Sequence, residues 1–217
     1  CNVLTLCRGD AKNRTGRDEL FGPVRSNHVT VMIRGHLYSM DVLDSSGAAL
    51  TDEAMLQRLR HIEADVASKE DGPYLGLLTA LDREEWAALH AELWSEPQSR
   101  QVLEKVHSSL FVVTLDQKDP GTDVNVAAKQ MLIGTGCDRW FDKWQMIITK
   151  EGQAGFNLEH SPYDGHTFVS MFNYMEQNRQ PPTFSSDSAS VDSDGVHHLA
   201  PGRLSSAVLK GIEKAAS

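Results

Sequence analysis

The sequence EHSPYDG, at positions 159–165, combines residues that could carry out acid–base chemistry. An imidazole changes its protonation state near neutral pH, so His160 is a candidate general base. Asp164 follows four residues later, a spacing that places two side chains on one face where a turn leads into a helix. Gly165 allows a close backbone approach, and Pro162 stiffens the turn. The pattern therefore predicts a histidine whose ring is held by its own turn.

The same seven residues also have a structural interpretation, an aspartate that caps a helix beside an ordinary histidine, because short patterns match by chance. Seven further histidines have only interpretations of this kind. His61, His90 and His107 fall on expected helices, and His28 and His36 lie beside a hairpin. His197 and His198 lie in a polar segment, where metal binding would be adventitious. His160 differs from them because it lies where a strand ends, and strand ends in α/β sheets form ligand crevices.

The elements that must position His160 alternate between strands and helices. Residues 28–44 alternate apolar and polar side chains around a turn at Arg34-Gly35, which predicts a hairpin, and residues 142–160 predict a second one. Apolar runs predict strands at 74–78 and 109–116. Helices are predicted after the caps Thr51 and Asp82, over 99–107 and 123–132, after Pro162, and around Val208, Leu209 and Ile212. We therefore expect an α/β domain with a mixed sheet flanked by helices.

The chain divides into three expected parts. Residues 1–182 form the α/β segment that carries His160, and residues 183–198 form a Ser/Asp-rich polar linker without periodicity. Residues 199–217 form a helix that leads into an absent C-terminal half. Because the sequence begins with Cys1 and not with methionine, we expect it to be an internal fragment of a longer protein.

The composition is typical of a globular domain and argues against a nucleic-acid-binding protein, a membrane-spanning protein and a disulfide-rich protein. The 217 residues are 40% hydrophobic and 24% charged, which is typical of a globular domain, and the formal charge is −9. This charge repels nucleic acid, and no stripe of Lys and Arg offsets it. No apolar run is long enough to cross a bilayer. The three cysteines have no C-x-x-C spacing, so we expect reduced thiols, no disulfide framework and no metal site.

Several segments, in their order and spacing, resemble one enzyme family. They are LCRGD near Cys7, HVTVMIRGHLYSMDVLD (28–44), PYLGLLTALDREEWA (73–87), SLFVVTLD (109–116), RWFDK (139–143) and EGQAGFNLEHSPYDG (151–165). Together they resemble the catalytic-histidine half of carnitine and choline O-acyltransferases. The resemblance implies a chloramphenicol-acetyltransferase-like fold for coenzyme-A-dependent acyl transfer. It also implies that Arg139, Trp140 and Asp142 are scaffold.

The resemblance implies reversible transfer of an acyl group between coenzyme A and the hydroxyl of carnitine, with His160 as general base. Asp164 would orient the imidazole or lock the turn through an ion pair with an arginine, and Gly165 would let substrate approach closely. Acyl-CoA is then a substrate and no cofactor is bound permanently. The family's coenzyme A residues and its Ser/Thr-rich oxyanion motif correspond to sequence beyond residue 217. The family's compartments are mitochondrial, peroxisomal or cytosolic.

Two alternatives remain open. The acceptor could be choline, as in choline O-acetyltransferases, because the residues that separate the two acceptors are not in this sequence. The chain could also be a truncated or regulatory family fragment without catalysis. In either case we expect residues 1–217 to be inactive alone and to expose an apolar face.

Overall fold

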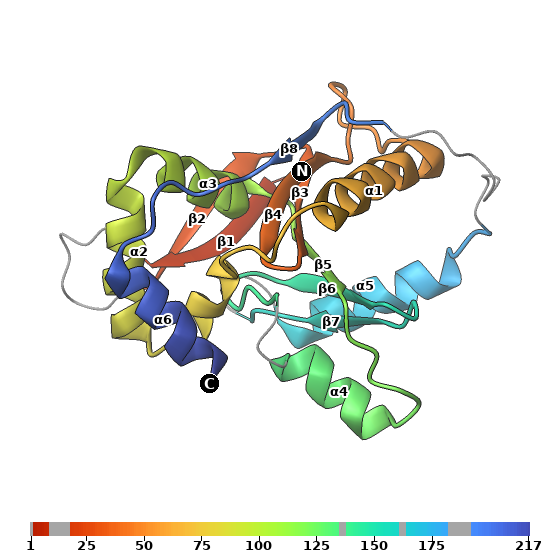
Figure 1. Ribbon diagram of the computed structural model, residues 1–217. Coiled ribbons are helices and arrows are strands. Elements are labelled where there is room, and N and C mark those ends of the chain that lie inside the picture. Colours follow the sequence, from red (N-terminus) through yellow and green to blue (C-terminus); the bar gives the residue numbers. More distant parts are fainter. Residues whose placement is uncertain (1, 9–17, 135–137, 161–163, 182–191) are drawn as a thin grey trace.

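The computed structural model describes residues 2–8, 18–134, 138–160, 164–181 and 192–217 (Figure 1). Its centre is a six-stranded sheet in the order β7-β6-β5-β3-β4-β8. The strands are β3 (His28–Ile33), β4 (His36–Asp41), β5 (Val112–Asp116), β6 (Gln145–Thr149), β7 (Ala154–Asn157) and β8 (Val196–His198). Strand β5 runs parallel to β3 and β6, and the other pairs are antiparallel. The expected mixed sheet with flanking helices is therefore confirmed.

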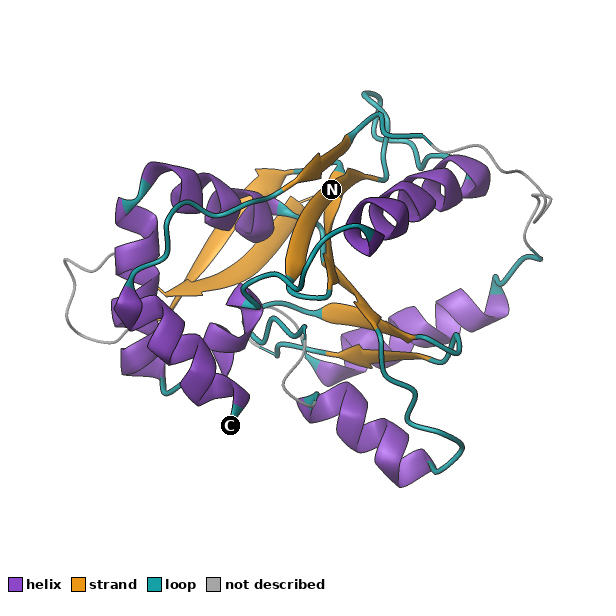
Figure 2. Ribbon diagram, viewed as in Figure 1, coloured by secondary structure: helices purple, strands orange, loops and turns teal. Residues whose placement is uncertain are grey.

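Alternating side chains give the sheet two apolar faces. On β3, Val29, Val31 and Ile33 face one core, which α1 (Asp52–Ala67) covers with Ile62 and Val66. Met32 faces the other core. That second core is covered by η1 (Leu75–Ala80), α2 (Arg83–Ser95), α3 (Pro97–Ser108) and α6 (Ser206–Ala216), as Figure 2 shows. The sheet is thus the middle layer of three.

The β6–β7 hairpin, which leads to His160, is packed between two helices, one on each face. Pairing of β6 with β7 places Ile147 opposite Gly155 and Met146 opposite Phe156. On the Gly155 side lies α4 (Val124–Ile133), since a Cβ at Gly155 would be 2.7 Å from Met131 Cγ. On the other side lies α5 (Gly165–Gln177), where the Phe172 ring is 4.5 Å from that of Phe156. The strand that leads to His160 is therefore held between two helices.

The predicted helix starts are confirmed by their caps. The Thr51 hydroxyl accepts a hydrogen bond from the Ala54 amide, and the Asp82 and Asp123 carboxylates cap α2 and α4 in the same way. The turn of the first hairpin is at Arg34 and Gly35, both with positive φ. No helix in the described ranges is long and apolar enough to span a membrane.

The prediction of a strand at 74–78 is wrong. Residues Leu75–Ala80 form the 3₁₀ helix η1, which follows Tyr74 in a left-handed conformation. An apolar run without periodicity does not distinguish a buried strand from a buried helical turn. Here the turn packs on the sheet, and Gly76 lies directly against the backbone carbonyl of Arg139.

The interpretation of 183–198 as a linker is wrong at its end, and its residues 183–191 lie outside the described ranges. Residues 196–198 form β8, because they pair with Tyr38, Ser39 and Met40 at the open edge of β4. A three-residue strand has too few residues to show a periodic pattern. The hairpin of β1 (Asn2–Arg8) and β2 (Asp18–Arg25) was also not predicted.

Candidate active site

His160 lies three residues after β7 and five before Gly165, and its side chain is exposed. The amide of Gly165, at the start of α5, donates a hydrogen bond to His160 Nε2 at 3.0 Å. A neutral ring that accepts at Nε2 carries its proton on Nδ1. The turn thus fixes one tautomer and places a basic nitrogen at the surface, beside the first residue of a helix.

Asp164 caps α5. Its carboxylate accepts the His166 amide at 3.0 Å, and its backbone is extended, as at most N-caps. Among the described residues, no hydrogen bond or ion pair joins Asp164 to His160 or to an arginine. Its contact with the imidazole is indirect, because the helix start that it caps presents the Gly165 amide to the ring.

Gly165 does not have the unusual torsion that its type allows, since it is not among the glycines with positive φ. A Cβ at this position would lie 3.4 Å from His160 Nε2, which is ordinary van der Waals contact. The contact that Gly165 makes with the site is its backbone amide, a group that any residue except proline supplies.

A buried ion pair joins the end of β5 to the segment before β6. Arg139 and Asp116, both with fully buried side chains, are joined between Nη2 and Oδ2 at 2.8 Å. The Asp116 carboxylate also accepts from the Lys118 amide and from Gln130 Nε2. Arg139 donates in addition to the carbonyl of Gln130, near the end of α4, at 2.7 Å. One arginine therefore ties β5 to α4.

Asp138, next to this pair, is also buried, and both of its carboxylate oxygens accept the Gly35 amide at 3.1 Å. Burial raises the pKa of the Asp138 carboxyl to about 7, because desolvation opposes its charge more than the Gly35 hydrogen bond and Arg139 favour it. The group joins the segment before β6 to the first hairpin.

The expectation that Arg139, Trp140 and Asp142 are scaffold is supported by their burial, since all three lie in the interior. The Asp142 carboxylate accepts from Arg83 and from the Trp86 indole, both on α2, at 2.6 Å. These contacts join α2 to the segment before β6.

The other histidines of the described chain lie on other elements, except His166, which is in the first turn of α5. His90 and His107 stack at 5.4 Å inside the second core, and burial lowers the pKa of His90 to about 4. His36 Nδ1 and His198 Nε2 lie 3.2 Å apart at the β4–β8 edge, opposite to β7. The described residues contain no group of three or more potential metal ligands.

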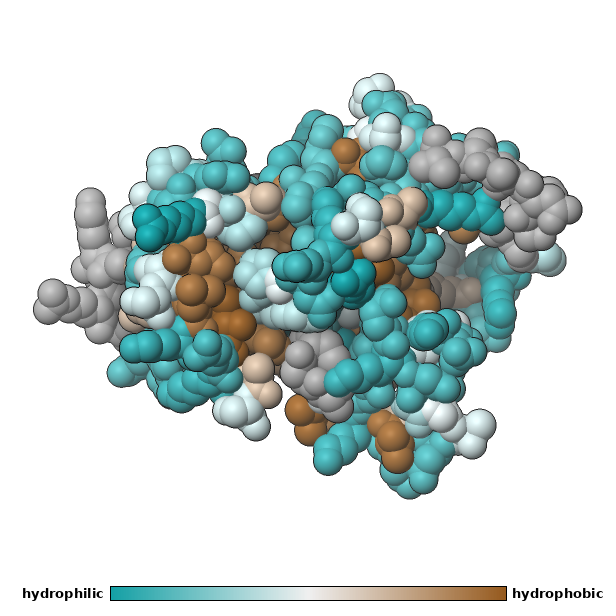
Figure 3. Space-filling model, viewed as in Figure 1, coloured by the Kyte–Doolittle hydropathy of each residue, from teal (hydrophilic) through white to brown (hydrophobic). Residues whose placement is uncertain are grey.

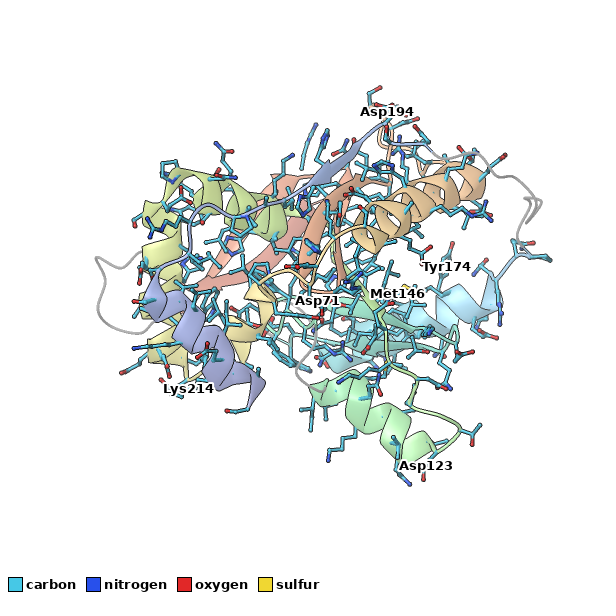
Figure 4. The ribbon with its side chains drawn as sticks, viewed as in Figure 1. Asp71, Asp123, Met146, Tyr174, Asp194 and Lys214 are labelled. Atoms are coloured by element: carbon cyan, nitrogen blue, oxygen red, sulfur yellow. The ribbon has the colours of Figure 1, made fainter. Side chains whose placement is uncertain are left out.

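Two cavities are lined by residues other than His160. One, of about 540 Å³, lies between α3 and residues 198–200. The helices beside His160 instead expose apolar side chains, some of which appear as brown atoms over α4 in Figure 3. They are Val124, Val126, Leu132 and Ile133 on α4, and Val169, Tyr174 and Met175 on α5, with Tyr174 labelled in Figure 4.

The sequence predicted His160 and Asp164 as site residues, but it led to no prediction for three residues whose side chains join β5, β7 and the segment before β6 to other elements. Asp116 and Asp138 are carboxylates at the ends of apolar segments, a signal that the sequence does contain. The third is Asn157, whose amide binds the end of α4, and no local pattern indicates that contact.

The chain matches the family described as Choline/Carnitine o-acyltransferase over residues 6–217. It is 32% identical over 206 residues to mouse mitochondrial carnitine O-palmitoyltransferase 2, covering 93% of this chain and 31% of the relative. It is 31% identical over 156 residues to human peroxisomal carnitine O-octanoyltransferase, covering 70% of this chain and 25% of the relative. The chain thus spans about a third or less of the length of these relatives.

Proposed function

The chain belongs to the choline/carnitine O-acyltransferase family, and we propose that the protein carrying it transfers acyl groups reversibly between coenzyme A and the hydroxyl of carnitine. His160 is the general base in this proposal. The observation that carries it is an exposed imidazole three residues after β7 whose Nε2 carries no proton and accepts the Gly165 amide. Carnitine is preferred to choline because the relatives above are named for carnitine.

The chemistry needs one proton acceptor. As the carnitine oxygen attacks the thioester carbonyl, His160 takes the hydroxyl proton, because an alcohol is a weak nucleophile until it is deprotonated. The carbon–sulfur bond then breaks, and the proton passes to the leaving thiolate of coenzyme A. In the reverse direction the same imidazole deprotonates the thiol. Such a base contributes a rate factor on the order of 100 to 10,000.

The hydrogen bond from Gly165 sets a condition on this step. A ring nitrogen has one lone pair, and the Gly165 amide occupies that of Nε2 at 3.0 Å. The substrate hydroxyl must therefore replace the amide as the hydrogen-bond donor to Nε2. Until then the amide holds the ring in the tautomer whose acceptor nitrogen is Nε2.

Asp164 supports His160 through the helix in this account. By accepting the His166 amide it fixes the first turn of α5, and with it the direction of the Gly165 amide. Asparagine caps helices about as well as aspartate, whereas alanine costs about 1 kcal/mol. Asp164→Asn should therefore keep most activity and Asp164→Ala should lose more. Equal, large losses in both would favour a direct electrostatic role of the carboxylate.

Residues 1–217 alone should not catalyse transfer, since the relatives are about three times as long and the chain matches less than a third of each. The names of those relatives give two compartments, mitochondrion and peroxisome, as candidates for this protein.

The test is a thiol-release assay on the full-length protein with acetyl-, octanoyl- and palmitoyl-CoA, each against carnitine and choline. The proposal expects release that depends on carnitine. Release with choline alone would change the acceptor, and no acceptor-dependent release from a folded protein would remove the enzymatic function and leave a silent family member.

A further inference from the structure

The position of His160 relative to the sheet depends on the end of β7. The hydrogen bond that the His160 side chain accepts comes from Gly165, which belongs to the same turn, so it does not fix the turn relative to the sheet. Strand β7 has four residues and lies at the edge of the sheet, where β6 is its only partner among the described strands. A short edge strand is weakly fixed by its ladder, so side-chain contacts at its end determine where the next residues lie.

Asn157 is the last residue of β7, three residues before His160. It pairs with Gln145 and is two residues from Gly155, so it shares with Gly155 the face of the sheet that α4 covers. Its Nδ2 donates to the carbonyl of Leu132 at 2.6 Å, and it lies 3.4 Å from the carbonyl of Met131. These carbonyls belong to the last turn of α4, whose oxygens have no partner within the helix.

The last turn of α4 is itself fixed to the buried core. Arg139, held by Asp116, donates to the carbonyl of Gln130, which also accepts the Gly134 amide. The carbonyls of residues 130, 131 and 132 thus all accept from side chains outside the helix.

The rest of α4 has far fewer anchors. Gln130 is its one buried residue, and Val124 in its first turn is 79% exposed. Figure 1 shows the helix standing beside β7 at the border of the molecule. The C-terminal turn is therefore the part of α4 that can serve as a fixed point for β7.

We propose that Asn157 is a positioning residue for His160. Its amide fastens the end of β7 to the C-terminal turn of α4, and so fixes the starting point of the turn that carries the imidazole. The inference rests on the proposed role of His160 as the base. It predicts that loss of this amide lowers kcat, because a displaced base no longer meets the hydroxyl, while groups that bind substrate are unchanged.

The informative variant is Asn157→Asp, which has nearly the same shape but no donor at pH 7.5. It also places a negative charge against the negative end of a helix. We expect kcat to fall about 100-fold, the effect of a displacement of about 1 Å, with KM changed less than about threefold. Asn157→Ala should lose about 10-fold, and Asn157→Gln, which restores a donor, should recover part of that loss.

Asn178 supplies a matched control. Its Nδ2 donates to the carbonyl of Tyr174 at 2.8 Å, so it also binds the last turn of a helix, at the end of α5 far in sequence from His160. Asn178→Ala should therefore change thermal stability about as much as Asn157→Ala and leave kcat unchanged. All variants are made in the full-length protein, and circular dichroism with thermal unfolding confirms that each one folds.

His160→Ala, measured in parallel, separates the two proposals. If it loses activity while folded Asn157→Asp keeps the wild-type kcat, the positioning role is overturned and the base stands. The positioning role is likewise overturned if the Asn157 and Asn178 variants lose kcat equally. If His160→Ala is fully active, both proposals fall. A selective loss of kcat at Asn157, with partial recovery in Asn157→Gln, supports the inference.

Discussion

Replacing Arg139 by methionine should be among the most damaging substitutions in this chain. The Arg139 and Asp116 side chains are both fully buried, and the structure joins them at 2.8 Å. Arg139→Met leaves the Asp116 carboxylate in the core without its cation; among the described residues, the Lys118 amide and Gln130 Nε2 remain as donors to it.

Arg139→Met should lower the unfolding free energy because it leaves a buried charge without a partner. Breaking a buried ion pair at one partner destabilises a protein by about 3–5 kcal/mol, whereas replacing both partners is often nearly neutral. Arg139→Met should therefore lose about 3–5 kcal/mol of unfolding free energy. Asp116→Asn added to Arg139→Met removes the unpaired charge and keeps an acceptor, so the double variant should recover about 2 kcal/mol or more.

The assay is urea denaturation at 25 °C and pH 8, followed by circular dichroism, for the wild type, both single variants and the double variant. The four values form a double-mutant cycle, and its coupling energy isolates the pair from the other contacts of each residue. The ion pair does not stabilise the fold in this way if Arg139→Met costs less than about 1 kcal/mol, or if the double variant is no more stable than that single variant.

Two further predictions concern packing and pH. Gly76→Ala should lower the unfolding free energy by about 1–3 kcal/mol, because the added Cβ would overlap the backbone carbonyl of Arg139. Gly155→Ala should lower it less, because the added Cβ would meet the flexible side chain of Met131. Equal melting temperatures of the two variants would contradict this. The folded-state pKa of Asp138, about 7, exceeds the ordinary 3.8, so the wild type loses stability as the pH rises from 4 to 7. Asp138→Asn removes this loss, and we expect it to be more stable than the wild type by up to about 4 kcal/mol at pH 7. A difference in unfolding free energy that does not change with pH would refute this.

The parts of the fold that sequence predicted are those fixed by neighbours along the chain. Val29, Val31 and Ile33 alternate within one strand, and the turn that follows has Gly35 at positive φ. Caps such as Thr51 act within three residues. Such signals are complete within a short window, so the sequence alone is enough to predict these elements.

The parts that sequence missed depend on partners far along the chain. Strand β8 forms because residues 196–198 meet β4, more than 150 residues earlier. The buried run after Tyr74 becomes helical where Gly76 meets the backbone of Arg139. At the candidate site, the position of His160 followed from its turn, whereas the contact of Asn157 with α4 spans 25 residues.

The role of His160 as the base can be tested by comparing His160→Ala with His166→Ala in the full-length protein. His166 is also an exposed histidine of this turn and helix, and its backbone amide, which alanine would keep, donates to Asp164. The measurement is kcat/KM for carnitine-dependent thiol release. We expect a loss of about 100- to 10,000-fold for His160→Ala and of less than about threefold for His166→Ala. Equal values for the two folded variants would contradict it.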